Sequence, residues 1–158
     1  MKESLFNIIA PYIPKAEVLD LFAGTGNLGI EALSRGANSA VFIDKSQECN
    51  QVIRENLLHT KLGQNAEVYV GDVFTTIDRL AAGNRKFDVI FLDPPYNKNL
   101  IEVTLNCIVK NDIIKEESII VAERDIEDAI PETIGCLSLF RNQKYGDTIL
   151  SFYKKCSS

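Results

Sequence analysis

Short apolar runs alternate with amphipathic stretches along most of the chain, and this alternation restricts the fold more than any other feature of the sequence. The apolar runs have the length and composition of buried strands, and we expect strands at residues 17–22, 40–43, 67–70, 87–92 and 118–122. The stretches around them carry apolar residues at helical spacing, and we expect helices at residues 3–10, 28–35, 47–61, 74–82 and 100–109.

Strands that alternate with helices form right-handed βαβ units, in which helices cover both faces of a parallel sheet. Residues 136–140 and 148–153 are two further β-rich runs around the sequence RNQKYGD, and they predict a hairpin. We therefore expect an α/β fold with a doubly wound, mostly parallel seven-stranded sheet and a C-terminal antiparallel hairpin. The chain of 158 residues shows no linker or repeat, so we expect one domain over residues 1–158.

The composition argues against several classes of protein. No apolar run approaches the length of a membrane span, and the scattered cysteines and single histidine, His59, suggest reduced thiols in the cytoplasm and no metal site. A net charge of −5 argues against a protein that coats nucleic acid generally. The charge is uneven, because residues 112–132 are rich in acids and residues 141–155 are mostly basic. We interpret the acidic stretch as a solvated surface.

A glycine-rich sequence, DLFAGTGNLG, follows the first strand and contains the G-x-G-x-x-G motif of Gly24, Gly26 and Gly29. Such glycines permit a tight turn and let a ligand approach backbone N–H groups at a helix N-terminus. The motif alone is weak, since a tight turn without a ligand also explains it. Asp44 ends the second strand 20 residues after Gly24, where nucleotide-binding sheets place a carboxylate that accepts the ribose hydroxyls. Together the two features predict a cofactor that contains a nucleoside.

Acids also accompany other strands of the predicted sheet. Asp72 follows the third strand and could accept the amino group of an adenine, while Val73 and Phe74 pack against the ring. Asp20, inside the first strand, could fix the glycine loop or meet an ammonium group of the ligand. Asp44 and Asp72 could each be a helix N-cap instead, but this alternative explains one acid better than a row of acids along one sheet edge.

The fourth strand ends in Asp93-Pro94-Pro95-Tyr96, and its prolines stop any ladder or helix from continuing. A hydride-transfer enzyme has no evident use for this sequence, which argues against NAD. An exocyclic amino nitrogen is a poor nucleophile, and acceptors for its N–H groups make its lone pair available. Asp93 and the Pro94 carbonyl could be these acceptors, and Tyr96 could stack on the base. A stiff turn capped by Asp93 is the alternative.

These residues resemble the Rossmann-like S-adenosylmethionine-dependent methyltransferases, and more specifically the 16S rRNA (guanine-N2)-methyltransferase family. The matching stretches are KESLFNIIAPYI, VLDLFAGTGNLGIEALSRGA, FDVIFLDPPYNKNL and KYGDT. The D-P-P-Y motif is shared with enzymes that methylate amino groups of adenine and cytosine in DNA and RNA, whereas LFAGTGNLGIEALSRGA points to the ribosomal RNA group. The family usually begins with a basic β-hairpin segment before the residues that match Lys2, and we expect RNA binding to be weaker without that segment.

The resemblance implies methyl transfer from S-adenosylmethionine to the N2 amino group of a guanine in 16S rRNA. The expected partner is the small ribosomal subunit or its assembly intermediate, and the enzyme is expected to be a monomer that does not bind membranes. The expected cofactor-binding residues are Asp20, Phe22, Ala23, Gly24, Thr25, Gly26, Asp44, Lys45, Asp72 and Val73. The expected catalytic residues are Asp93, Pro94, Pro95 and Tyr96, and weaker candidates for RNA contacts are Lys98, Arg141 and Lys144.

Other functions stay open at this point. Within the same chemistry, the chain could methylate N6 of adenine, or another amino group, in DNA or a different RNA. From a different class, it could be an inactive module that binds cofactor or RNA, because the basic segment before Lys2 is missing and the chain is acidic. An NAD-dependent oxidoreductase agrees least with the strand ends.

Overall fold

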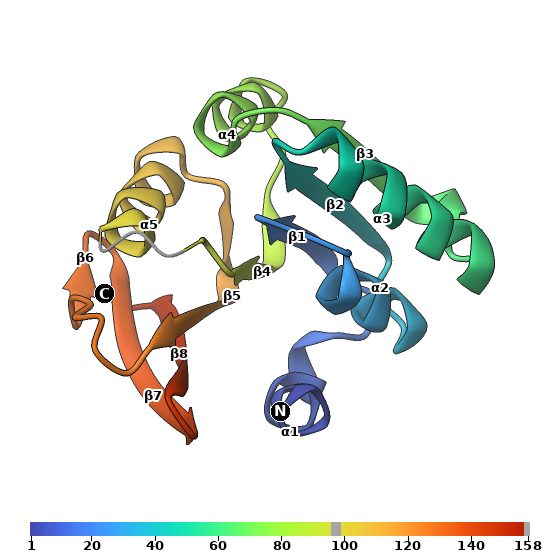
Figure 1. Cartoon of the computed structure of the whole chain (residues 1–158). Helices are drawn as coiled ribbons and strands as arrows, with labels where there is room; N and C mark the ends of the chain where they lie inside the picture. Colours follow the sequence, from blue (N-terminus) through green and yellow to red (C-terminus); the bar gives the residue numbers. More distant parts are fainter. Residues whose placement is uncertain (96–98, 157–158) are drawn as a thin grey trace.

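The strands form a mixed sheet that is eight-stranded over the part of the chain that the computed structural model describes, residues 1–95 and 99–156 (Figure 1). Its order is β3-β2-β1-β4-β5-β8-β7-β6. The strands are β1 (Glu17–Leu21), β2 (Ser39–Asp44), β3 (Ala66–Val70), β4 (Phe87–Leu92), β5 (Ile114–Asp125), β6 (Thr133–Ile134), β7 (Leu137–Tyr145) and β8 (Thr148–Lys155). The helices are α1 (Lys2–Ile9), α2 (Asn27–Ser34), α3 (Gln47–Thr60), α4 (Val73–Ala82) and α5 (Leu100–Asn111), with short 3-10 helices η1 (Ala10–Tyr12) and η2 (Gly63–Asn65).

The parallel part of the sheet is built around β1, which pairs in parallel with both β2 and β4. β3 and β5 continue it on either side, again in parallel. β8 then pairs antiparallel with β5, and β7 and β6 extend this antiparallel region. The carboxyl ends of β3, β2, β1, β4 and β5 therefore meet at one edge of the sheet.

Helices bury both faces of this sheet, as expected for a doubly wound fold (Figure 1). Val18 of β1 packs in a core with residues of α1, α2 and α3, whereas its neighbour Leu19 packs in a second core with residues of α4 and α5. Successive side chains of a strand point to opposite faces, so a strand buried on both faces must be apolar throughout. This requirement explains the continuous apolar runs in the sequence.

The α/β class and the mostly parallel sheet agree with the sequence prediction, but the predicted total of seven strands was wrong for the described residues. The missed strand is β6, which pairs with the start of β7 and has only two residues, too few to show a periodic pattern. β5 and β7 are also longer than predicted. β7 runs through the polar sequence RNQK because it lies near the sheet edge and is largely exposed there. The other predicted elements end within two residues of their observed bounds.

Close packing between α2 and the sheet provides the first test of this fold. A Cβ atom at Gly29 would lie 2.7 Å from Cζ of Phe42, whose ring is fully buried. We expect Gly29→Ala to lower the free energy of unfolding by about 1–3 kcal/mol despite the better helix propensity of alanine. Gly63→Ala is the matched control, since its Cβ would have Leu57 Cβ as nearest neighbour at 3.9 Å. Equal urea midpoints for the two variants would contradict this packing.

Candidate active site

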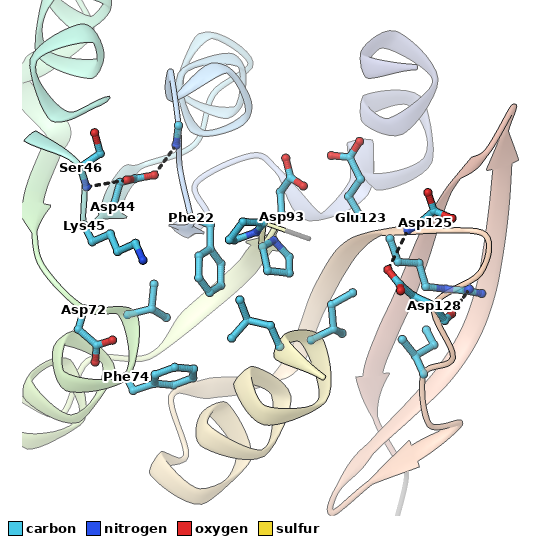
Figure 2. A pocket seen from close by; sticks show the side chains of 18 of the residues that line it. Phe22, Asp44, Lys45, Ser46, Asp72, Phe74, Asp93, Glu123, Asp125 and Asp128 are labelled. Carbon is cyan, nitrogen blue, oxygen red and sulfur yellow. Dashed lines mark hydrogen bonds between the residues drawn. The ribbon is translucent and has the colours of Figure 1, made fainter. Parts of the chain in front are cut away.

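A pocket of about 890 Å³ lies along the carboxyl edge of the parallel strands (Figure 2). Segments that follow β1, β2, β3 and β4, together with the end of β5 and the start of α5, contribute side chains to its wall. The structure brings together in this wall most of the residues selected from the sequence: Phe22, Gly24, Asp44, Lys45, Asp72, Val73, Asp93, Pro94 and Pro95. This volume is in the usual range for a site that holds a small molecule.

The glycine loop between β1 and α2 turns sharply through left-handed backbone conformations. Phe22, Gly24 and Gly26 have φ angles of 57°, 60° and 79°. A Cβ atom at Gly24 would meet no atom within 4 Å, so the backbone of this residue faces open space. A ligand can therefore approach the main chain closely at Gly24, the reason that glycine is used in such loops.

Asp44 connects the glycine loop to the segment after β2. Its Oδ2 accepts the N–H of Gly24 at 3.0 Å, and its Oδ1 accepts the N–H of Ser46 at 2.9 Å. Each carboxylate oxygen can accept more than one hydrogen bond, so Asp44 retains acceptor capacity toward the pocket. The N-cap of α3 is Ser46, whose hydroxyl accepts the Cys49 N–H, and the cap alternative for Asp44 is wrong.

Asp72 does cap a helix. Its Oδ2 accepts both the N–H and the hydroxyl of Thr75 in the first turn of α4. The side chain also lines the pocket, close to Phe74 in Figure 2. A capping role and a ligand-binding role are therefore compatible at this position, because one carboxylate can serve several donors.

Asp20 lies beneath the glycine loop and does not line the pocket. Its side chain is buried, and its Oδ2 accepts the N–H of Gly29 at 3.1 Å. Burial raises the pKa of Asp20 to about 8; the Gly29 hydrogen bond opposes this rise, while the charges of Asp93 and Asp44 add to it. Asp20 therefore stabilises the start of α2 from inside the protein, and burial favours the protonated form of its carboxyl group.

Asp93 and Glu123 form a pair of neighbouring carboxyl groups at the ends of β4 and β5. Asp93 is exposed on its pocket side; partial loss of water contact and the nearby Glu123 carboxyl group raise the pKa of Asp93 to about 7. A neighbouring negative charge disfavours ionisation of Asp93. The sequence analysis did not select Glu123, because it falls in the acidic stretch that we interpreted as a solvated surface.

The segment after β5 forms the far end of the pocket, on the right in Figure 2, and was also missed from the sequence. Arg124 fixes this segment: its Nε donates to Ser151 Oγ at 3.0 Å and its Nη1 donates to the Asp128 carbonyl at 2.8 Å. The Asp125 N–H donates to the Asp128 carboxylate at 3.4 Å. The only sequence signal for this wall is the cluster of charged residues directly after an apolar strand.

Several predicted site residues lie elsewhere. Ala23, Thr25 and Gly26 belong to the glycine loop but do not line the pocket. Arg141 and Lys144 are exposed on β7, away from the pocket wall. Tyr96 and Lys98 lie outside the described residues, so their predicted roles stay predictions. Among residues 1–95 and 99–156 there is no cluster of side chains suited to a metal ion and no helix with the length and apolar character needed to cross a membrane.

Comparison with known proteins gives a consistent result. Residues 1–154 match the family model described as conserved hypothetical protein 95. The chain is 41% identical to the putative rRNA methyltransferase YlbH of Bacillus subtilis, over 98% of this chain and 84% of the relative. It is 34% identical to ribosomal RNA small subunit methyltransferase D of Escherichia coli, over 98% and 76% of the two chains. A solved structure of a conserved hypothetical protein from Streptococcus pyogenes has a TM-score of 0.89 and 33% identity, covering 97% of this chain and 94% of that one.

The burial of Asp20 predicts a specific dependence of stability on pH. Burial raises the pKa of Asp20 in the folded protein from its ordinary value of 3.8 to about 8, so the stability that Asp20 contributes is fully present below about pH 4 and is lost as the pH rises through about 8. Asparagine can still accept the Gly29 N–H and does not titrate. We therefore expect Asp20→Asn to gain stability relative to wild type between pH 5 and pH 8, by on the order of 1–3 kcal/mol. Parallel pH curves for the two proteins in urea unfolding would contradict a buried, protonated Asp20.

Proposed function

The chain belongs to the family described as conserved hypothetical protein 95 and is a methyltransferase, and from this premise we propose that it methylates the exocyclic N2 amino group of a guanine in 16S rRNA with S-adenosylmethionine as methyl donor. The observation that carries this proposal is the convergence of Gly24, Asp44, Asp72 and Asp93 in one pocket. The names of the B. subtilis and E. coli relatives support ribosomal RNA as the substrate, and the name of the latter supports the small subunit.

The residues around the glycine loop fit S-adenosylmethionine. The open approach to the Gly24 backbone suits the amino-acid part of the cofactor, and the free acceptor capacity of Asp44 suits two ribose hydroxyls. Asp72 can accept the amino group of the adenine, whose ring can lie against the apolar side chains of Val73 and Phe74. When bound, the cofactor supplies an electrophilic methyl group on a positively charged sulfur.

The Asp93-Pro94-Pro95 segment then prepares the amino group of the base. The Asp93 carboxylate and the Pro94 carbonyl accept its N–H groups, which directs the nitrogen lone pair toward the methyl group. Pro95 limits the conformations of Pro94 and so fixes the direction of that carbonyl. Both hydrogen bonds strengthen as positive charge develops on the nitrogen, so they stabilise the transition state more than the bound substrate. In this proposal Tyr96 stacks on the base.

We propose a cytoplasmic monomer whose substrate is 16S rRNA in the small subunit or in its assembly intermediate. Lys98, Arg141 and Lys144 stay candidates for phosphate contacts. Their contribution would be electrostatic and would not depend on the base. Methylation of adenine N6 in DNA or another RNA is the alternative substrate assignment, and an inactive binding module is the alternative of a different class.

Measurements of cofactor binding should distinguish the residues that contact the cofactor from those that contact the base. We expect Asp44→Ala to weaken binding of S-adenosylhomocysteine by roughly 100-fold, because it removes the acceptor for the ribose hydroxyls and the hydrogen bond that holds the Gly24 N–H. Asp93→Ala should bind within about threefold of wild type, since Asp93 contacts the base and not the cofactor in this proposal. Isothermal titration calorimetry measures both, with Asp78→Ala on the exposed side of α4 as the matched control. Unchanged binding by Asp44→Ala would refute its assignment.

Labelling with tritiated S-adenosylmethionine tests the reaction and its substrate. Wild-type protein is incubated with small subunits, naked 16S rRNA and DNA, and the products are digested to nucleosides. We expect labelled N2-methylguanosine from an RNA substrate, and a loss of at least about 100-fold in rate for Asp93→Ala, in line with the loss of an aligned transition-state acceptor. Labelled N6-methyladenosine would favour the alternative substrate. A protein that binds S-adenosylhomocysteine but labels nothing would favour the inactive module.

A further inference from the structure

We propose that Glu123 determines specificity for the target base by accepting the N1–H of guanine while Asp93 accepts an N–H of the 2-amino group. This inference rests on the proposed function and assigns a role to a side chain that the motifs do not include. Glu123 lines the same pocket as Asp93, and the two residues directly follow the paired residues Leu92 and Ala122 of β4 and β5.

The register of the sheet places these carboxyl groups side by side. Leu92, the last residue of β4, pairs with Ala122 of β5 in a parallel ladder; Asp93 directly follows β4, and Glu123 is the next residue of β5. Leu92 and Ala122 both pack in the core beneath α4 and α5. Since side chains alternate along a strand, Asp93 and Glu123 both point to the opposite face of the sheet. Figure 2 shows the two carboxyl groups at the same rim of the pocket.

No ion pair of the described residues neutralises these two carboxyl groups, and Lys2, a cation in the wall of a small cavity that they share, pairs with Glu31 instead. Both residues also line a small, mostly apolar cavity of about 40 Å³, whose wall includes Leu5 and Leu150. Among the ion pairs of the described residues, none includes Asp93 or Glu123. Arg124, the nearest cation along β5, is held by Ser151 and the Asp128 carbonyl instead. Two neighbouring carboxyl groups without an ion-pair partner favour a ligand that presents N–H donors to them.

Guanine has the pattern of donors that this pair requires. Its N1–H and 2-amino group are adjacent donors, which neighbouring carboxylates can accept together. The corresponding edge of adenine places an acceptor, N1, beside its amino group, and cytosine places N3 beside its amino group. An acceptor facing an ionised carboxylate is repelled and loses its hydrogen bond, a penalty that gives strong discrimination at a polar site. Glu123 thereby selects the base, and Asp93 serves the amino group.

The test compares guanine with 2-aminopurine at the nucleotide mapped by the labelling experiment. 2-Aminopurine keeps the 2-amino group, but its N1 is an acceptor. We expect wild-type protein to prefer guanine by about 100-fold or more in methylation rate. Glu123→Gln should reduce this ratio at least tenfold, because the glutamine amide can donate to N1 of 2-aminopurine and its oxygen can still accept the N1–H of guanine. 2-Aminopurine also lacks O6, but this difference is the same for both enzymes. The change in the guanine-to-2-aminopurine rate ratio between wild type and Glu123→Gln therefore reports the contact of residue 123.

Glu117→Gln is the matched control, since it makes the same substitution at an exposed position of β5 outside the pocket wall. It should keep the wild-type ratio. Thermal melting and S-adenosylhomocysteine binding establish that each variant is folded with an intact cofactor site. If Glu123→Gln slows both substrates equally, Glu123 has only a structural role and the inference is overturned. If wild-type protein methylates neither guanine nor 2-aminopurine while it binds S-adenosylhomocysteine, the proposed function fails first and this inference fails with it.

Discussion

The parallel pairing of β1 with both β2 and β4 determines where this protein can perform chemistry. The connection after β1 leads through α2 to β2 on one side, whereas β4 and β5 lie on the other side, so the connecting segments diverge at the carboxyl end of β1. Such a divergence leaves a crevice that helices do not fill. The pocket occupies this crevice. Much of its wall comes from residues at or directly after the ends of these strands, so the strand ladder sets their relative positions.

The strand ends place acids together, and this has an electrostatic cost that a ligand can relieve. Asp20 is buried near the charges of Asp44 and Asp93, and Asp93 lies beside Glu123. The pKa of Asp20 is raised to about 8 and that of Asp93 to about 7, so the protein holds protons in this region near neutral pH. A cationic cofactor and a base with N–H donors would both stabilise the ionised forms. In the proposed reaction, this negative potential would favour the sulfonium form of the methyl donor over the uncharged thioether that remains after transfer.

The sequence predicted the fold well wherever burial leaves a periodic pattern. β4 was predicted at its observed bounds because both of its faces are covered and its ends are marked by polar residues and prolines. β5 was predicted too short because its first residues, Ile114 to Glu117, are mostly charged and solvent-exposed although they continue the strand. β6 has two residues and depends on pairing with β7, which no local pattern reveals. Prediction failed where tertiary pairing, and not apolar periodicity, makes a strand.

The site residues also divide into those that a local motif reveals and those that only the pairing of distant strands brings into place. Asp44 and Asp93 could be selected from the sequence because each stands at a fixed place in a recognisable motif. Spacing alone could not show that Asp72 caps a helix whereas Asp44 accepts the N–H of Gly24, since both residues lie between a strand and a helix. Glu123 belongs to no motif, and its place beside Asp93 follows from the pairing of Leu92 with Ala122. A shift of one residue in that ladder would turn the Glu123 side chain to the other face of the sheet. If Asp93 and Glu123 bind the base as we propose, the register of β5 on β4 specifies this part of the pocket, and substitutions that alter the register should change base selection without touching the D-P-P-Y sequence.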